Sequence, residues 1–294
     1  MFTSAPVLAL ITALCIGSAD FSSHYALRHV RALPGTFFSI SFQLFTLLVI
    51  LLIRGKWDVG DWRGPAFFIL VGILHPGIFF LFLLMAIDRL GPARAITLKG
   101  TSPFFGVAIA IIFLGERPNF PIYLGLFLVA GGVMYLTSER GSGIRLSRNL
   151  ALPLIAAFFG GLAPNLAKVA LGYMNDAPMG AACVVFGGLV AMFLCNTLLA
   201  GKVDGKFWLR ATASRAVFLF APMGMLGAFG FITYFTALKF GSVAVVIPLV
   251  QTAPFVAVLL SRVLIQEQER VNLQLLVSVV SIVLGAVLIT MGRA

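Results

Sequence analysis

Charged side chains are scarce in this sequence. Only 11% of its 294 residues are charged, whereas 60% are hydrophobic, and the mean hydropathy is +1.05. A soluble domain of this size needs roughly a quarter of its residues charged to cover its surface. The scarcity of charge therefore excludes a soluble domain as the main unit and predicts a protein whose solvent is largely lipid.

The sequence also lacks the motifs of common enzymatic and nucleotide-binding sites. It contains no G-x-x-x-x-G-K-[ST] phosphate loop and no H-E-x-x-H zinc helix. The three cysteines, Cys15, Cys183 and Cys195, all fall within apolar runs, which is typical of small core residues and not of a disulfide or metal set. We therefore expect no cofactor, no metal, no enzyme and no ATP-driven pump within this chain.

The net charge of +11 does not indicate a nucleic-acid partner. The Lys and Arg residues lie singly in short connections between apolar runs, where lipid phosphates are their expected partners. We predict membrane lipids and a small-molecule substrate as partners, no nucleic acid, and a monomer or a weak homodimer.

Long apolar runs are the dominant feature. A bilayer core of ~30 Å is crossed by about 20 helical residues, and ten runs of this length can be counted. A backbone in lipid must satisfy its own hydrogen bonds, and an apolar run of this length does so as a helix. We predict an all-α integral membrane protein with ten transmembrane helices, at residues 5–25, 34–53, 65–87, 93–114, 120–138, 150–171, 178–200, 215–238, 243–265 and 271–291.

One apolar string occurs twice. The segment "AITLKGTSPFF" (95–105) returns as "VIPLVQTAPFV" (246–256), with Ile, Leu, Thr, Pro and Phe in register. Lys99 of the first copy is replaced by Val250 in the second. The chain therefore carries an internal repeat in which only one copy is charged.

The repeat extends over the whole chain. The segment "ALRHVRALP" (26–34) matches "ALGYMNDAP" (170–178), which places the first run on the sixth. We therefore predict two five-helix halves, at residues 1–140 and 146–294. Because five is odd, the second half must be inserted upside down, and such inverted repeats are typical of transporters.

Several motifs carry a resemblance to a known family. They are "IGSADF" in the first run, "TSPFF…LGER" in the fourth and "TAPFV…QER" in the ninth. With these motifs the whole chain resembles the EamA-type transporters of the drug/metabolite transporter superfamily. The resemblance implies ten helices, no cofactor and the export of small metabolites, often amino acids, by alternating access. Members of the family often carry Arg in the second span, where this chain offers Gln43.

The orientation of the chain has two conflicting indications. The resemblance implies that both termini lie in the cytoplasm. Of the 21 Lys and Arg, however, six lie on the side of the termini, thirteen on the other side and two within the membrane. Because positive charge favours the cytoplasmic side, this distribution predicts termini that face outward. Both orientations stay open.

Two opposite charges lie inside the predicted membrane region at a similar depth. Each charge there costs several kcal/mol unless it is paired or hydrated, so it should face the bundle interior. A helical rise of about 1.5 Å per residue places Asp20 and Lys99 roughly 10–12 Å from the same surface, in one layer with Gln43. The two charges either pin two helices together or bind a substrate, and one pair could do both.

Other polar residues extend this candidate site. His75 and His24 could carry a coupling proton, as could Asp20, because histidine titrates near neutral pH. A proline within a helix removes a backbone hydrogen bond and kinks the helix. The full set of candidates is Lys99, Asp20, Gln43, His75, Gln251, Thr252 and Tyr234 for the substrate, Asp20, His75 and His24 for proton coupling, and Pro103, Pro248 and Pro254 for helix kinks.

Taken together, the residues and the resemblance predict a secondary transporter. It would export a small metabolite, with an amino acid or a similar zwitterion or anion as the first candidate, across the inner cell membrane as a multi-pass protein. Broad-specificity drug efflux and metabolite uptake are the alternatives within the same class. An intramembrane enzyme built on Asp20 and His75, or a scaffold, is the alternative from other classes.

Overall fold

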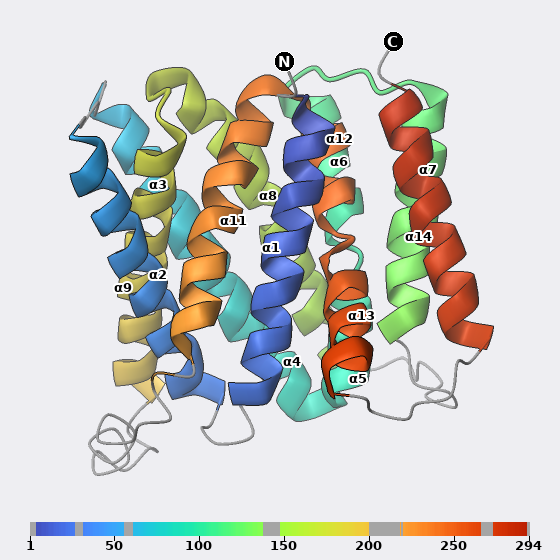
Figure 1. Cartoon of the computed structure of the whole chain (residues 1–294), viewed down its shortest axis with the longest axis horizontal. Helices are drawn as coiled ribbons and strands as arrows, with labels where there is room; N and C mark the ends of the chain where they lie inside the picture. The colour runs from blue at the N-terminus through green and yellow to red at the C-terminus, as the bar shows by residue number, and fades with distance from the viewer. Residues whose placement is uncertain are drawn as a thin grey trace.

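The computed structural model describes residues 4–26, 32–55, 61–137, 148–199, 218, 220–265 and 273–292. Within these residues the chain is helical and contains no strand. Ten of the described helical segments are long and apolar enough to cross a membrane, and they stand side by side as one bundle (Figure 1). The prediction of an all-α membrane protein with ten spans is confirmed.

The first five spans include two that are divided. The helices of this half are α1 (Ala5–Ala26), α2 (Ala32–Arg54), the third span as α3 (Arg63–Gly72), η1 (Ile73–Ile78) and α4 (Phe79–Leu90), the fourth span as α5 (Pro92–Lys99) and α6 (Ser102–Phe113), and α7 (Phe120–Thr137).

The second five spans include one that is divided. After the short η2 (Arg148–Leu150), the helices of this half are α8 (Ala151–Tyr173), α9 (Ala177–Leu199), α11 (Ala221–Phe240), the ninth span as α12 (Val243–Val250) and α13 (Ala253–Ile265), and α14 (Leu273–Met291).

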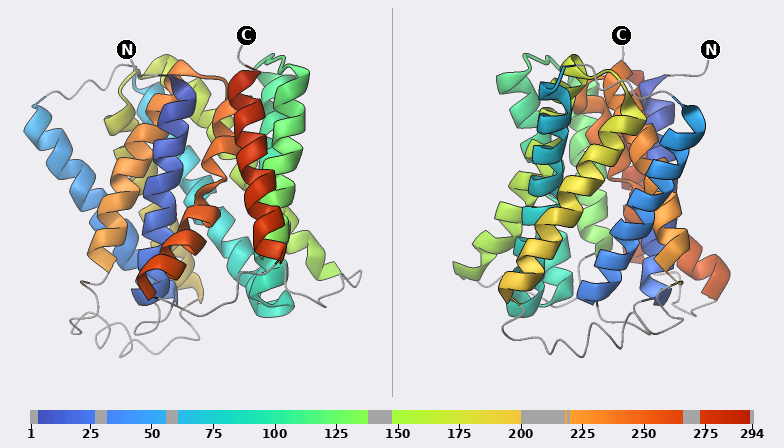
Figure 2. Two further views of the ribbon diagram at one scale, coloured as in Figure 1. Left: turned by 45° about the vertical axis from the view of Figure 1, so that its right-hand side comes forward. Right: turned by 90° about the vertical axis from the view of Figure 1, so that its left-hand side faces the viewer.

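The two halves are inserted in opposite directions. Helix α1 runs away from the side of the termini, whereas α8, its counterpart in the second half, runs toward that side (Figure 1). Contacts between the halves occur in matching pairs: α1 packs on α11 as α8 packs on α3, and α6 packs on α8 as α13 packs on α1. Helices α7 and α14 lie side by side at one end of the bundle (Figure 2). The fold therefore consists of two inverted five-helix repeats.

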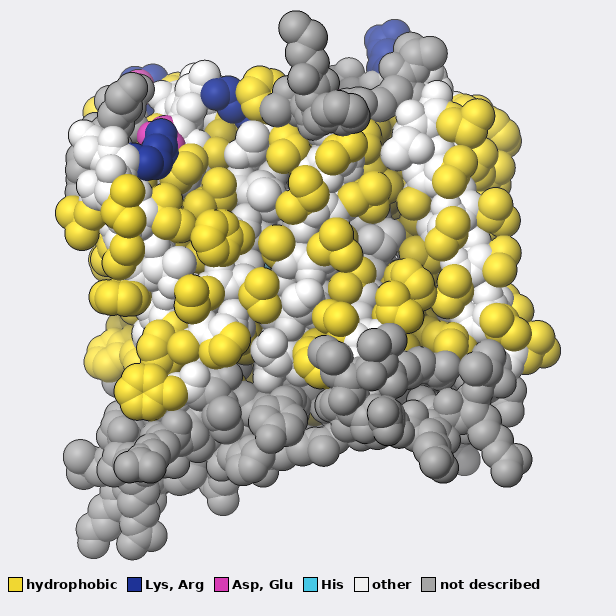
Figure 3. Space-filling view, in the orientation of Figure 1, with side chains coloured by type: hydrophobic (Ala, Val, Ile, Leu, Met, Phe, Trp, Pro, Cys, Tyr) yellow, Lys and Arg dark blue, Asp and Glu magenta, His cyan; other side chains and the backbone are white. Residues whose placement is uncertain are grey.

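The outer face of the bundle is apolar. Large hydrophobic side chains are exposed along the described helices, among them Phe45, Ile53, Phe127, Phe193 and Leu276. Figure 3 shows hydrophobic side chains over the height of the helices, with Lys and Arg at the edge on the side of the termini. This distribution fits a bilayer, in which apolar side chains contact lipid and charged ones lie near the headgroups.

The repeated string breaks one helix in each half in the same way. In the fourth span the Thr101 N–H and hydroxyl both donate to the carbonyl of Leu98, at 3.1 and 2.7 Å. In the ninth span the N–H and hydroxyl of Thr252 donate to Leu249 in the same pattern, at 3.2 and 2.7 Å. The threonine satisfies a carbonyl that the ending helix leaves without an intrahelical donor. The threonine that both copies of the string share therefore explains why each copy ends a helix at the same position.

The halves approach closely where α6 crosses α8. A Cβ built on Gly161 would lie only 2.5 Å from the backbone nitrogen of Gly106, so neither position leaves room for a side chain at this crossing. Asn165 of α8 is buried there, and its amide donates to the carbonyls of Gly106 (3.0 Å) and Gly161 (2.8 Å). The crossing brings α8 against the start of α6, close to the centre of the bundle.

Candidate functional site

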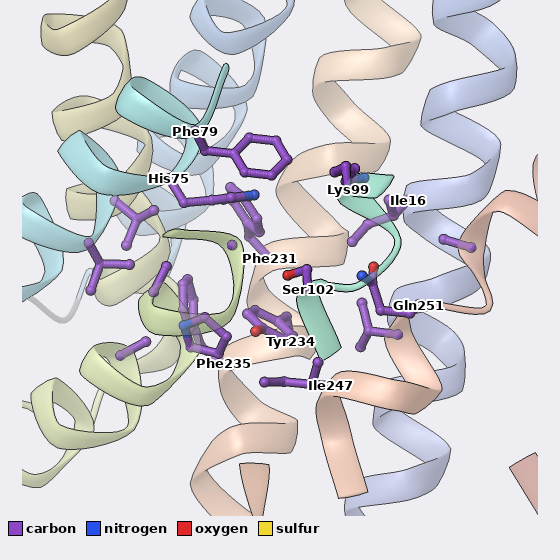
Figure 4. Close-up of a pocket in the computed structure, with 18 of the residues that line it drawn as sticks. Ile16, His75, Phe79, Lys99, Ser102, Phe231, Tyr234, Phe235, Ile247 and Gln251 are labelled. Atoms are coloured by element: carbon purple, nitrogen blue, oxygen red, sulfur yellow. The ribbon is translucent and has the colours of Figure 1, made fainter. Parts of the chain in front are cut away.

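A cavity of about 250 Å³ lies between the two halves at the level of the helix breaks. The third, fourth, sixth, eighth and ninth spans contribute to its lining together with α1, and so does Val184 of α9. Figure 4 shows polar side chains from several of these helices converging on one space. Most of the remaining lining is apolar, including Phe79, Phe80, Phe231 and Phe235.

Both intramembrane charges that the sequence indicated reach this cavity. Asp20 comes from α1 and is exposed, while Lys99 ends α5 and is half-buried. The two groups interact electrostatically. Both charges line the cavity between the halves, where they avoid the cost of an unpaired charge in hydrocarbon.

His75 is brought to the cavity by a break in the third span. Its backbone is extended (φ −145°, ψ 113°) between two helical segments, and Pro76 follows it. The imidazole ring lies 4.4 Å from the ring of Phe79, measured between centroids. The Lys99 ammonium lies 5.6 Å from the same Phe79 ring, so this aromatic ring contacts both groups (Figure 4). An ammonium near the face of an aromatic ring is attracted by the ring quadrupole.

Three neutral polar side chains complete the lining. Gln251 directly follows α12 in the break of the ninth span, Tyr234 comes from the middle of α11, and Ser102 begins α6 (Figure 4). These groups can donate and accept hydrogen bonds, whereas the charged groups supply one cation and one anion. The cavity therefore offers complementary partners for a small molecule that carries both signs of charge.

The breaks also aim helix ends at the cavity. Helices α5 and α12 end at Lys99 and Val250, and helices α6 and α13 begin at Ser102 and Ala253, and all four residues line the cavity. The N-terminal end of a helix carries partial positive charge and the C-terminal end partial negative charge. Half-helix ends of this kind occur at the substrate sites of transporters built from inverted repeats.

Two of the candidate substrate residues do not reach the cavity. The side chain of Gln43 on α2 is nearly buried and lies against α11, where a Cβ added to Gly227 would be 3.3 Å from its amide. Thr252 is buried, and its hydroxyl binds the carbonyl of Leu249 at the helix break. The estimate of depth from the sequence was therefore no guide to the direction in which Gln43 points.

The remaining candidates lie near the breaks or outside the described part. Pro103 and Pro254 are each the second residue of a new helix, directly after a break. Pro248 lies inside α12, whose helical backbone continues to Val250, so the break does not fall at this proline. The side chain of His24, near the end of α1, lies outside the described residues.

Sequence reasoning missed Phe79 and Ser102 as cavity residues. Phenylalanine is too frequent in this chain, with 28 copies, for any one ring to stand out. Ser102 does carry a signal, because it directly follows the threonine at which the repeated string ends its helix.

Ten apolar helices in two inverted repeats, with a mixed-charge cavity where broken helices meet, define a membrane transporter architecture. The model of the EamA-like transporter family matches residues 3–138 and again residues 148–291. The chain therefore belongs to the EamA-like transporter family and is a multi-pass membrane transporter.

A solved structure has the same fold. It is a crystal structure of a protein that superposes with a TM-score of 0.78, covering 98% of this chain and 96% of the other chain. The two sequences are 19% identical, so the likeness concerns the fold alone. None of the curated proteins matches this sequence.

Proposed function

We propose that this transporter is a secondary carrier that exports a small zwitterion or anion, with an amino acid as the first candidate, by alternating access across the inner cell membrane. The observation that supports this proposal is the placement of Lys99 and Asp20 in one cavity between the halves. A cation and an anion that interact with each other can separate to hold the carboxylate and the ammonium of one molecule.

The cavity has a part for each chemical group of such a substrate. The Lys99 ammonium, together with the N-terminal ends of α6 and α13, favours a carboxylate. The Asp20 carboxylate accepts an ammonium group or a proton, and Gln251 and Tyr234 supply neutral hydrogen bonds. The phenylalanine rings that line the remaining wall favour an apolar portion of the substrate.

The repeat supports the mechanism. Two similar halves inserted in opposite directions can rock about a central site and open it to either side. Only one of the two copies of the repeated string needs the charge that Lys99 supplies, because the substrate itself is not symmetric. Asp20 and His75, which line the cavity, are the proposed proton-coupling groups, and His24 stays a further candidate.

Flux of labelled compounds into proteoliposomes tests the proposal. A panel of amino acids, sugars and cationic drugs should show saturable transport for a zwitterion or anion, and Lys99→Met should lose it. Loss of a hydrogen-bonded charge contact costs about 1.5–3 kcal/mol, or roughly a ten- to hundredfold loss of apparent affinity. Lys99→Arg keeps the charge and should retain part of the flux.

The control is Lys239→Met, which removes an exposed lysine at the end of α11, away from the cavity. Normal export by Lys99→Met would mean that the lysine is a structural partner only. Loss of folding without a specific loss of flux would mean that Lys99 and Asp20 serve as a helix-pinning ion pair. Transport of cationic drugs alone would favour broad-specificity efflux.

A further inference from the structure

The cavity is closed on the side of the termini. Helices α8 and α11 both continue past the cavity toward that side, and α12 begins there (Figure 1). Residues of these continuations, Ala170, Leu238 and Val246, have no exposed surface. Asp20, which lies toward the opposite end of the cavity, is exposed. Buried segments of these helices therefore lie between the cavity and the side of the termini in this conformation.

A carboxylate joins the two halves at the closed end. Glu116 follows α6 of the first half and reaches the start of α12 in the second half. The N–H of Val243 donates to Glu116 Oε1 at 2.6 Å, and the N–H of Ala244 donates to Oε2 at 2.9 Å. A negative charge at a helix N-terminus is stabilised by the N–H groups that have no intrahelical acceptor. Gly115, at φ 67°, gives the turn that this position requires.

A lysine holds the same turn from the other side. The Lys168 ammonium donates to the carbonyls of Leu238 and, at 2.6 Å, Gly241, at the end of α11. Lys168 also interacts electrostatically with Glu116. The turn between α11 and α12 is therefore fixed at both ends, and one of the two fixed points belongs to the other half of the protein.

Glu116 joins α6 to α12. Each of these helices is the segment of a broken span that lies on the side of the termini. Helix α6 leads from Ser102 at the cavity to Glu116, and α12 leads from Val243 back to the cavity at Val250. These two helices also pack on each other. Separation of α6 from α12 would open a path from the cavity to the side of the termini, and it would break the Glu116 contact.

We infer that Glu116 is the latch of the gate on the side of the termini, closed in this conformation and released in each transport cycle. This inference rests on the alternating access proposed above. Glu116 is a positioning residue, since it lies outside the cavity and acts through α12. Glu269, its equivalent in the sequence repeat, lies outside the described residues.

Cysteine labelling tests the latch without any substrate. Ile247→Cys, on α12 and lining the cavity, serves as reporter in a chain that lacks its native cysteines. A membrane-impermeant maleimide is added to proteoliposomes in which a C-terminal tag is accessible from outside. We expect Glu116→Gln to raise the labelling rate from this side about tenfold, which corresponds to ~1.4 kcal/mol in the ratio of open to closed gate.

A second variant breaks the same contact from the other partner. Val243→Pro removes the N–H that binds Glu116, at the first position of α12, where proline is tolerated. Ser242, the residue before it, already has the extended backbone that proline demands (φ −74°, ψ 150°). This variant should fold and should raise labelling in the same direction, so the test stands even where Glu116→Gln is unstable.

The matched control is Asp61→Asn, an exposed carboxylate on the same side whose partner among the described residues, Arg63, belongs to its own half. Labelling in Asp61→Asn should equal that of the parent. Unchanged labelling in both latch variants would overturn the inference. Faster labelling from both membrane sides would also overturn it, because the Glu116 contact would then stabilise the whole bundle and not the gate on one side. Absence of amino-acid flux together with the expected rise in labelling would reject the proposed substrate but not the Glu116 latch.

Discussion

The crossing of α6 and α8 gives a sharp test of how tightly the halves are packed. Gly161→Ala would place its Cβ 2.5 Å from the backbone nitrogen of Gly106 and 2.8 Å from the carbonyl oxygen of Ser102. Both neighbours are backbone atoms, so no change of rotamer relieves the overlap. Restoring ordinary contact would require the helices to separate by about 1 Å, which forfeits dispersion contacts along the crossing.

The size of the effect follows from this geometry. Overpacking of this kind costs about 1–3 kcal/mol. The control is Gly172→Ala on the same helix, where an added Cβ meets nothing within 4 Å and the change should be neutral or slightly stabilising. Thermal unfolding in detergent, followed by the amount of monodisperse protein after heating, measures both. Equal stability of the two variants would refute the packing argument.

Two further predictions concern the side of the termini and the orientation of the chain. Lys168→Met leaves two carbonyls at the end of α11 without their donor and should lower stability by about 1–3 kcal/mol in thermal unfolding, whereas Lys239→Met, at an exposed site, should not. Reporter fusions to the C-terminus, one active only in the cytoplasm and one only outside, will show a single side: a cytoplasmic signal would contradict the charge distribution, and an external one the family pattern.

Much of the architecture could be predicted from the sequence, because the bilayer constrains the backbone strongly. Apolar length alone predicts the ten spans, and two of the three prolines expected to kink helices, Pro103 and Pro254, lie directly after the breaks of the fourth and ninth spans. The charges of Asp20 and Lys99 could be assigned to the interior because hydrocarbon excludes them, and both line the cavity.

The directions of side chains and the partners of polar groups could not be predicted from the sequence. Gln43 has the depth of the cavity but points at Gly227, since depth does not fix rotation about the helix axis. Lys168 could have reached toward the interface from its place in α8, yet it binds carbonyls of α11. Glu116 was visible only as a repeat match, because its partners are backbone N–H groups far along the chain.

The break at His75 makes the two halves unequal in a way that affects kinetics. The span of the second half that corresponds to the third span is α11, and it runs as one unbroken helix from Ala221 to Phe240. The two halves are therefore not equivalent, and the conformation open to one side of the membrane differs in free energy from the conformation open to the other side. A difference of ~1.4 kcal/mol would make one resting population tenfold larger. Such an imbalance drives no net flux, which only a gradient can do, but it gives each membrane face its own half-saturating concentration.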